Sequence, residues 1–259
     1  MVGDLLRLTV LGSATPYASV DNPCSGYLLS SAGTKVWMDA GSGTLAQLQR
    51  HARLDQLDAI WISHLHADHS ADLLTAYYAA LHADLQLAAP IPLYAPPGIA
   101  DRLAHFLTNG PTRSPVESAF AIHELADGHQ THIGALTLTS RAVAHGLPAF
   151  AVRIETEGRS LVYSGDTAPC VNLTRLAEAC DVLLCEAESA DAPAENEQVH
   201  QVHHTPENAG DTADAARAGR LIVTHVGPFL TPHQAATRAS TRFDGPVDYA
   251  APGATFLIG

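Results

Sequence analysis

The hexapeptide His64-Leu65-His66-Ala67-Asp68-His69 places three imidazoles and one carboxylate within six consecutive residues. Imidazole nitrogen and carboxylate oxygen are ligands that zinc and manganese ions favour in proteins. In an extended loop, side chains two positions apart point the same way, so His64 and His66 can share one ion. Asp68 and His69 follow at a turn and would point to a neighbouring place. The pattern therefore indicates two adjacent metal sites.

The residues on either side of the hexapeptide predict a loop between a strand and a helix. Leu57–Ser63 is typical of a buried β-strand, whereas Ser70–Tyr78 fits a helix. Further strands are expected at Leu5–Leu11, Ser25–Ser31, Lys35–Asp39, Ile91–Tyr94, Ala119–Leu125, Leu136–Ala144, Ala149–Glu155, Ser160–Ser164, Val182–Glu186, Leu221–Thr224 and Ala254–Ile258, and helices at Gly43–His51, Gly98–Leu107, Val171–Ala179, Thr205–Ala218 and Pro232–Ser240.

The order of these elements predicts one α/β domain made of two similar halves. A polar stretch containing Gly and Pro, Asn109–Ser118, is typical of a seam between them. Halves of about 1–115 and 116–259 favour two sheets packed face to face with helices outside. A chain of 259 residues is long enough for a single domain, 1–259, with a substantial core.

Composition excludes several classes of protein. The chain carries 27 acidic and 14 basic side chains, a formal charge of −13, and one lysine, Lys35. This balance disfavours a protein that binds long nucleic acid through its phosphates. The four cysteines form no CxxC pair and are expected to be reduced, buried thiols. Neither a signal peptide nor an apolar run long enough to span a membrane is found, so we expect a cytoplasmic protein.

Three later residues carry ligand-type side chains directly after predicted strands. His145 follows one strand, Asp166 lies in a Ser-Gly-Asp-Thr turn after a second, and His225 follows a third. Loops at strand ends commonly carry functional side chains over a rigid scaffold. Each residue alone is a weak signal, but together with the hexapeptide they supply enough ligands for two ions.

This series of motifs resembles the metallo-β-lactamase fold superfamily, whose members share an HxHxDH loop followed by His, Asp and His. The resemblance covers nearly the whole chain and implies a four-layer αββα sandwich of two mixed sheets. By this resemblance His64, His66 and His145 hold one metal ion. Asp68, His69 and His225 hold the other, and Asp166 bridges both. Zinc is the favoured ion, and manganese or iron would also suit such ligands.

Three further segments resemble the phosphodiesterase branch of that superfamily, which includes ribonuclease Z and short bacterial cyclic-nucleotide phosphodiesterases. Ser164–Cys170 is similar to its SGDT turn, and Leu184–Glu188 is similar to its HEAT segment with Cys185 in place of His. His203–Gly210 is similar to its HxTxxxAG segment. The catalytic residues implied are Asp68, Glu186 and His203, the last two as a proton shuttle. His204, one position on, is an alternative to His203, and His200 is also near.

The spacing between the later ligands favours a small substrate. Ribonuclease Z generally carries a long arm between the third His and the bridging Asp, whereas His145 and Asp166 leave room only for two strands and a turn. We therefore expect a phosphodiester hydrolase that cleaves a cyclic nucleotide such as 3′,5′-cAMP, using a hydroxide shared by two metal ions. The alternatives are a ribonuclease Z-like tRNA 3′-processing endonuclease, an ester, lactone or thioester hydrolase, and a non-enzymatic metal- or nucleotide-binding module.

Other expectations concern the surroundings of the site and the assembly. The loop Gly12–Tyr17 and the turn Asp39–Gly43 either line the pocket or are only tight turns. The acidic stretch 186–198 is expected to be a mobile loop, with a lid as one role for it. The resemblance is also compatible with a homodimer.

Overall fold

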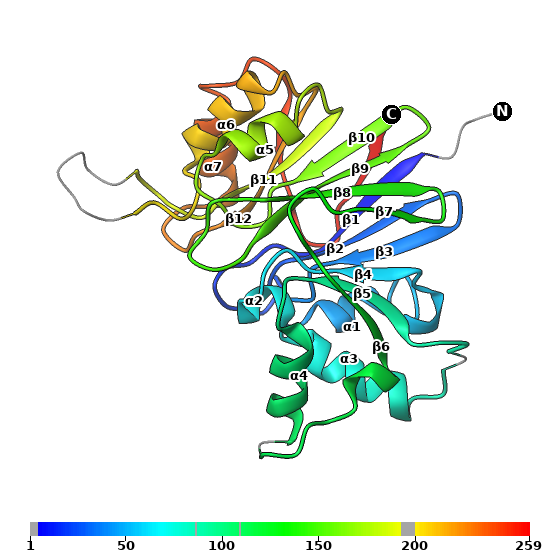
Figure 1. Cartoon of the computed structure of the whole chain (residues 1–259). Helices are drawn as coiled ribbons and strands as arrows, with labels where there is room; N and C mark the ends of the chain where they lie inside the picture. Colours follow the sequence, from blue (N-terminus) through cyan, green and yellow to red (C-terminus); the bar gives the residue numbers. More distant parts are fainter. Residues whose placement is uncertain (1–4, 86, 109, 193–199) are drawn as a thin grey trace.

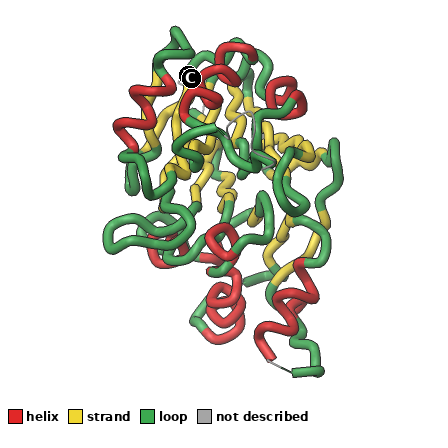
Figure 2. Tube along the Cα trace, turned by 90° about the vertical axis from the view of Figure 1, so that its left-hand side faces the viewer, coloured by secondary structure: helices red, strands yellow, loops and turns green. Residues whose placement is uncertain are grey.

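The computed structural model describes residues 5–85, 87–108, 110–192 and 200–259. Two seven-stranded mixed sheets lie face to face, and helices cover the outer face of each (Figures 1 and 2). Helices α1, α3 and α4 lie below the first sheet in Figure 1, and α5, α6 and α7 lie above the second. This arrangement confirms the predicted four-layer αββα sandwich.

The first sheet has the order β14-β1-β2-β3-β4-β5-β6, and the second has the order β13-β12-β11-β10-β9-β8-β7. The first sheet comprises β1 Leu6–Gly12, β2 Gly26–Ser31, β3 Thr34–Met38, β4 Ala59–Trp61, β5 Ile91–Ala95, β6 Phe120–Glu124 and β14 Thr255–Ile258. The second comprises β7 Gln130–Ile133, β8 Leu136–Ala142, β9 Phe150–Thr156, β10 Arg159–Tyr163, β11 Val182–Ala187, β12 Leu221–Val226 and β13 Val247–Tyr249. The helices are α1 Thr44–Leu48, α2 Ala67–Ser70, α3 Asp72–His82, α4 Ile99–Thr108, α5 Val171–Leu176, α6 Pro206–Ala215 and α7 Pro232–Ala239, with short 3₁₀ turns at Leu54–Gln56 and Val116–Ser118.

Three apolar layers hold the four structural layers together. The central layer joins the two sheets and contains an aromatic cluster of Tyr27, Trp61 and Tyr163. The ring of Tyr163 packs edge-on against Tyr27 at 5.1 Å and against Trp61 at 6.3 Å between centroids. Such pairs contribute roughly 0.5–1.5 kcal/mol each beyond the area they bury. The other two apolar layers lie between each sheet and its helices.

The strand directions bring several loop ends to one edge of the sandwich. In the first sheet β3, β4 and β5 are parallel, and in the second β10, β11 and β12 are parallel. Carboxyl ends of parallel strands meet at the same edge, where α/β proteins place their ligands. The predicted functional side chains lie after β4, β8 and β10 and, since β12 extends past the predicted Thr224, inside the end of β12, and this topology explains how they can converge.

The sheets do not divide at the predicted seam of 109–118. Strand β6 follows the seam but pairs with β5 in the first sheet, and β14 at the end of the chain pairs with β1. The division into 1–115 and 116–259 therefore differs from the division into sheets. Strands β7 and β13 were not predicted, because β7 is largely polar and β13 has three residues. No helix in the described ranges is long and apolar enough to cross a bilayer.

Candidate metal centre

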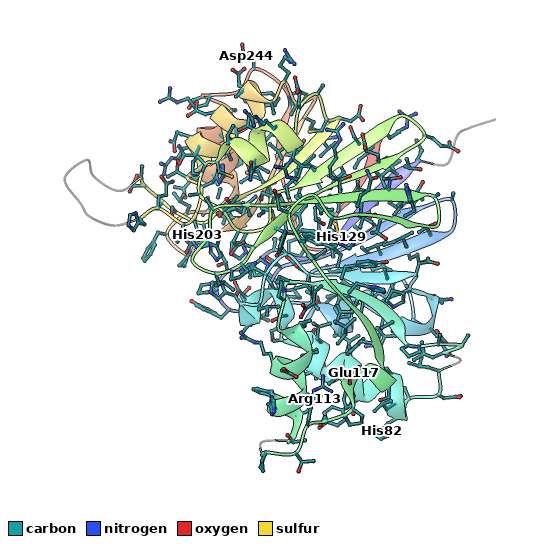
Figure 3. The ribbon with its side chains drawn as sticks, viewed as in Figure 1. His82, Arg113, Glu117, His129, His203 and Asp244 are labelled. Carbon is teal, nitrogen blue, oxygen red and sulfur yellow. The ribbon has the colours of Figure 1, made fainter. Side chains whose placement is uncertain are left out.

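The seven predicted ligand side chains gather at one edge of the sandwich, between the two sheets. A cavity of about 260 Å³ opens beside them. It is lined by Thr15, Pro16, His66, Ala67, Asp68, Asp166, Glu188, His203 and His225. In Figure 3 the label of His203 marks this edge. Part of the predicted loop Gly12–Tyr17 thus lines the pocket through Thr15 and Pro16.

The first predicted ligand group comes together as expected. His64 Nε2 lies 3.0 Å from His66 Nδ1, and His145 Nε2 lies 3.2 Å from the same atom. One ligand atom from each of these residues and from Asp166 lies within 4.8 Å of all the others. His64 lies in the loop after β4 and is fully buried, whereas His66 is exposed and His145 is half-buried.

The second group lies on the other side of Asp166. Asp68, His69 and His225 also place their ligand atoms within 4.8 Å of one another. Asp166 faces both groups, because its Oδ2 is 3.5 Å from His64 Nε2 and 3.2 Å from His225 Nε2. Its Oδ1 is 3.3 Å from His69 Nε2. The bridging position predicted for Asp166 is therefore geometrically accessible to it.

Buried polar atoms in this cluster fit a bound cation. His69 Nε2, Asp166 Oδ1 and His225 Nε2 are buried and make no hydrogen bond within the described residues. Leaving a buried polar atom unsatisfied costs roughly 1–3 kcal/mol. A dication contacting these atoms would satisfy them all, since imidazole nitrogen and carboxylate oxygen are suitable donors. The residues present thus fit a divalent metal ion.

Burial and neighbouring charges shift the pKa values of several ligand candidates. Burial lowers the pKa of His64 well below its usual value, which keeps the imidazole neutral. Burial and the neighbouring His145 likewise lower the pKa of His66. Burial alone would raise the pKa of Asp166, but His225, His69 and His64 outweigh it and hold that pKa well below its usual range. Burial opposes protonation of His69, but the carboxylates of Asp166 and Asp39 outweigh it and raise the pKa of His69 well above its usual value, so a metal ion bound there would have to displace that proton.

Asp39 supports the cluster from behind and was not singled out by the sequence. Its carboxylate accepts hydrogen bonds from the Ser63 amide at 2.7 Å and the Ser63 hydroxyl at 2.8 Å. The Tyr163 hydroxyl donates to it at 2.7 Å, and His69 Nδ1 lies at 2.7 Å. With Nδ1 directed at Asp39, Nε2 of His69 faces the cluster. The turn Asp39–Gly43 therefore supports the ligands through Asp39 and does not line the cavity.

Two other ligand candidates are oriented through their second ring nitrogen. His225 Nδ1 lies 2.8 Å from the Ser25 hydroxyl, and His145 Nδ1 lies 3.0 Å from the Val202 carbonyl oxygen. His225 also has a left-handed backbone, with φ of 49°, inside β12. Such a residue interrupts the regular alternation of side chains along a strand. The backbone of β12 is therefore irregular at the point where its imidazole enters the cluster.

The loop after β3 packs closely against the loop after β4, which carries the hexapeptide. A Cβ atom at Gly41 would lie 2.1 Å from the carbonyl oxygen of Asp68. The Ala40 amide also donates to the His69 carbonyl oxygen at 2.7 Å. Gly41 is thus required for the close approach that aligns the hexapeptide.

Glu186 and His203 lie together at the rim of the cluster. His203 Nδ1 is 3.0 Å from Glu186 Oε1 and 3.9 Å from Asp166 Oδ2. The other contacts of Glu186 hold it in place, since the Thr167 amide donates to Oε1 at 2.8 Å and the Glu188 amide to Oε2 at 3.0 Å. Burial opposes protonation of His203, but the bond and charge of Glu186 outweigh it and raise the pKa to about 9.

The structure separates His203 from its neighbours. His204 is buried and turned away, with Nδ1 2.6 Å from the Thr167 carbonyl oxygen and Nε2 3.1 Å from the Thr212 hydroxyl. His200 is exposed. The chain direction here is set by Thr205, whose side chain caps α6 by accepting from the Asn208 amide at 3.2 Å. Of these three histidines, His203 alone lines the cavity within the described residues.

The predicted start of the acidic loop 186–198 is wrong, because the strand before it is longer than expected. Glu186 is fully buried inside β11, so the strand extends to Ala187. The Ser189 amide then donates to the His204 carbonyl oxygen at 3.0 Å. The stretch 193–199 lies outside the described residues.

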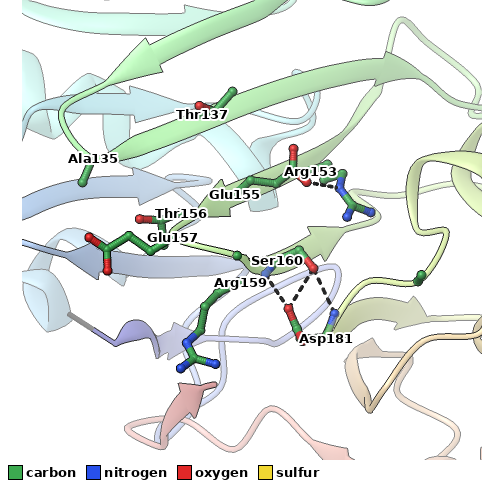
Figure 4. A pocket seen from close by; sticks show the side chains of 11 residues that line it. Ala135, Thr137, Arg153, Glu155, Thr156, Glu157, Arg159, Ser160 and Asp181 are labelled. Carbon is green, nitrogen blue, oxygen red and sulfur yellow. Dashed lines mark hydrogen bonds and ion pairs between the residues drawn. The ribbon is translucent and has the colours of Figure 1, made fainter. Parts of the chain in front are cut away.

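A larger cavity of about 410 Å³ lies elsewhere, around the turn between β9 and β10 (Figure 4). Three of its five charged side chains, Arg153, Glu155 and Asp181, have hydrogen-bond partners within the described residues. Arg153 contacts Glu155 at 3.0 Å and donates to the carbonyl oxygens of Leu176 and Glu178, and Ser160 donates to Asp181. Its described lining includes no histidine or cysteine, so it lacks the chemistry of the metal centre.

Replacement of Asp39 by Asn tests the support behind the ligands. An amide retains the size of the side chain but removes one acceptor and the charge that orients His69. We expect metal affinity to fall roughly 10- to 100-fold, the usual effect of losing such a partner. Competition with a chromogenic chelator measures this, with Asp58→Asn on the surface as the matched control. Equal affinities in wild type and both variants would contradict the role of Asp39.

Comparison with known proteins agrees with the geometry. A model of the beta-lactamase superfamily domain matches residues 34–226. An uncharacterized protein of Mycobacterium leprae (strain TN) is 34% identical over 258 residues, which cover 98% of this chain and 89% of the relative. Ribonuclease Z of Mycobacterium bovis (strain BCG / Pasteur 1173P2) is 29% identical over 279 residues, covering 94% of this chain and 95% of the enzyme.

Similarity extends to solved structures. The metallo-β-lactamase fold protein YhfI from Bacillus subtilis matches with a TM-score of 0.83 and 24% identity, over 98% of this chain and 99% of that chain. The family match covers most of the chain and includes all seven candidate ligands, the last of which, His225, lies one residue before the end of the matched range. The chain therefore belongs to the β-lactamase superfamily, has the metallo-β-lactamase fold and is related to ribonuclease Z.

Proposed function

We propose that this protein is a metal-dependent phosphodiesterase that hydrolyses a small cyclic nucleotide such as 3′,5′-cAMP. The observation that carries the proposal is the placement of His203, held by Glu186, beside a cluster that fits two divalent ions. Membership of the superfamily and the relation to ribonuclease Z support hydrolytic chemistry on phosphodiesters.

The candidate ligands form two groups, each of which would hold one ion. His64, His66 and His145 would hold one, Asp68, His69 and His225 the other, and Asp166 both. Divalent ions bound there would make hydroxide available near neutral pH and neutralise charge on the phosphate. Zinc is favoured, and manganese or iron would also suit these ligands. Asp68, which lines the cavity, would also help to orient the attacking water.

His203 is placed to protonate the leaving oxygen. Its Nδ1 is engaged by Glu186, whereas its Nε2 makes no hydrogen bond within the described residues. When hydroxide attacks phosphorus, the bond from phosphorus to the ribose 3′ oxygen breaks, and that oxygen needs a proton. An imidazole with a raised pKa carries that proton at neutral pH. Glu186 then acts as a positioning residue, because it fixes the ring and stabilises its charged form.

Substrate size is argued from the chain between the third and bridging ligands. Strands β9 and β10 form a hairpin there, joined by the short turn at Glu157 and Gly158. No arm extends from this hairpin to hold a folded RNA. The net charge of −13 also disfavours a long polyanion. These features support a small nucleotide as the partner of the site, and long nucleic acid as a poor one.

Hydrolysis of 3′,5′-cAMP by purified protein tests the proposal. With Zn²⁺ or Mn²⁺ present we expect AMP as the product, and we expect excess chelator to abolish turnover because the ligands then lose their ions. Chromatography of the products measures both. A tRNA precursor and a panel of carboxyl esters, lactones and thioesters serve as rival substrates. The proposal is wrong if a rival substrate is cleaved while neither cAMP nor bis(p-nitrophenyl) phosphate is.

Replacement of His203 by Ala separates proton transfer from metal binding. We expect turnover of cAMP to fall roughly 10²- to 10⁴-fold, the usual contribution of a general acid. Metal content should be unchanged, because the seven ligand candidates remain. The exposed His51→Ala variant is the control for loss of an imidazole. Loss of metal in the His203 variant would instead make this residue a ligand.

A further inference from the structure

An apolar groove lies directly beside the metal centre. It has a volume of about 160 Å³ and lies between α2 and the start of α3 on one side and α4 on the other. Figure 1 shows α4 standing next to α2 at this edge. The groove is lined mainly by Ala67, Leu74, Ile99, Leu103 and Phe106, with Arg102 at its side.

The groove adjoins the cavity of the metal centre. Ala67 lines both the groove and the metal cavity, and it stands between the ligand candidates His66 and Asp68. The Ser70 hydroxyl, also in the groove, donates to the His66 carbonyl oxygen at 2.8 Å. Neither cavity alone reaches the roughly 300–1,000 Å³ typical of small-molecule sites, whereas the two together do.

The exposed end of α4 has unusual side chains for a solvent-facing surface. Ile99, Leu103 and Phe106 follow one face of the helix at positions i, i+4 and i+7. The first two are buried, but Phe106 is 69% exposed. A phenyl ring at this position therefore extends the apolar stripe of the helix into the groove instead of into the core.

Arg102 stands one turn before Phe106 on the same helix face. Its guanidinium makes no ion pair within the described part of the chain, although the protein carries 27 acidic side chains. Among the described residues lining the groove and the metal cavity, it is the one Lys or Arg. An aromatic ring and a guanidinium plane are the two side-chain types on which nucleobases stack.

We propose that this groove binds the base of the nucleotide whose phosphate meets the metal centre. This inference rests on the proposed function and identifies the substrate as a nucleoside phosphodiester. The base stacks on Phe106 and contacts the guanidinium of Arg102, while the apolar floor of Leu74 and Leu103 excludes water. The ribose then spans the short distance past Ala67 to the ligand loop.

Single substitutions in the groove test the inference. For Phe106→Ala we expect KM for 3′,5′-cAMP to rise roughly tenfold with little change in kcat, because stacking stabilises substrate and transition state alike. Arg102→Ala should raise KM in the same way, and Phe106→Tyr should restore it. Methyl p-nitrophenyl phosphate has no nucleobase, so its hydrolysis should be unchanged. The exposed aromatic Tyr78→Ala on α3 is the matched control.

Binding of AMP, measured by calorimetry, gives a readout independent of turnover. Wild-type protein should bind AMP about tenfold more tightly than Phe106→Ala or Arg102→Ala. If the simple ester is cleaved but the variants match wild type towards cAMP and AMP, the groove assignment is wrong while the phosphodiesterase stands. The same holds if the wild type cleaves the ester and ignores cAMP. If neither ester is cleaved and AMP does not bind, both proposals fail.

Discussion

Buried polar atoms that have no hydrogen-bond partner among the described residues constrain the edge of the sandwich at the metal centre. His69 Nε2, Asp166 Oδ1 and His225 Nε2 come from three distant parts of the chain and lie close together, buried between the sheets. Each unsatisfied atom costs roughly 1–3 kcal/mol, so the fold would gain by relaxing them apart. The two histidines cannot move apart freely, because Nδ1 of His69 contacts Asp39 and Nδ1 of His225 contacts the Ser25 hydroxyl. A bound cation would contact these atoms and offset the cost of leaving them without hydrogen bonds.

The fold supplies the fixing elements from both sheets. Asp39 at the end of β3 orients His69 and accepts a hydrogen bond from Tyr163 of the second sheet. Ser25 before β2 similarly contacts His225 of β12. The aromatic cluster between the sheets lies beside these contacts, so packing and ligand orientation depend on each other. A rigid cluster of this kind is what a preorganised metal centre requires.

The sequence allowed the ligand side chains and most strands to be predicted, since apolar runs and motif spacing are local properties. The supporting residues were missed because Asp39 and Ser63 acquire their roles through contacts across the fold. Strand β7 escaped prediction because its residues are mostly polar, as on an exposed sheet edge. Glu186 was assigned to the start of an acidic loop, whereas β11 buries it completely. The resemblance to the HEAT segment nevertheless paired Glu186 with His203, and in the structure Glu186 Oε1 lies 3.0 Å from His203 Nδ1.

Local sequence patterns also could not predict which strands belong to which sheet. The turn-rich stretch before β6 resembles a boundary, yet β6 completes the first sheet by pairing with β5. Pairing partners are chosen by the packing of whole layers, which a seam in composition does not encode.

Metal stoichiometry tests the central claim most directly. Protein loaded with zinc, freed of loose ions by gel filtration and analysed by mass spectrometry for metal should contain two ions per chain. That number follows from two ligand groups joined by one carboxylate. A content of one ion per chain would contradict the shared role of Asp166, and a content near zero would contradict the metal centre itself.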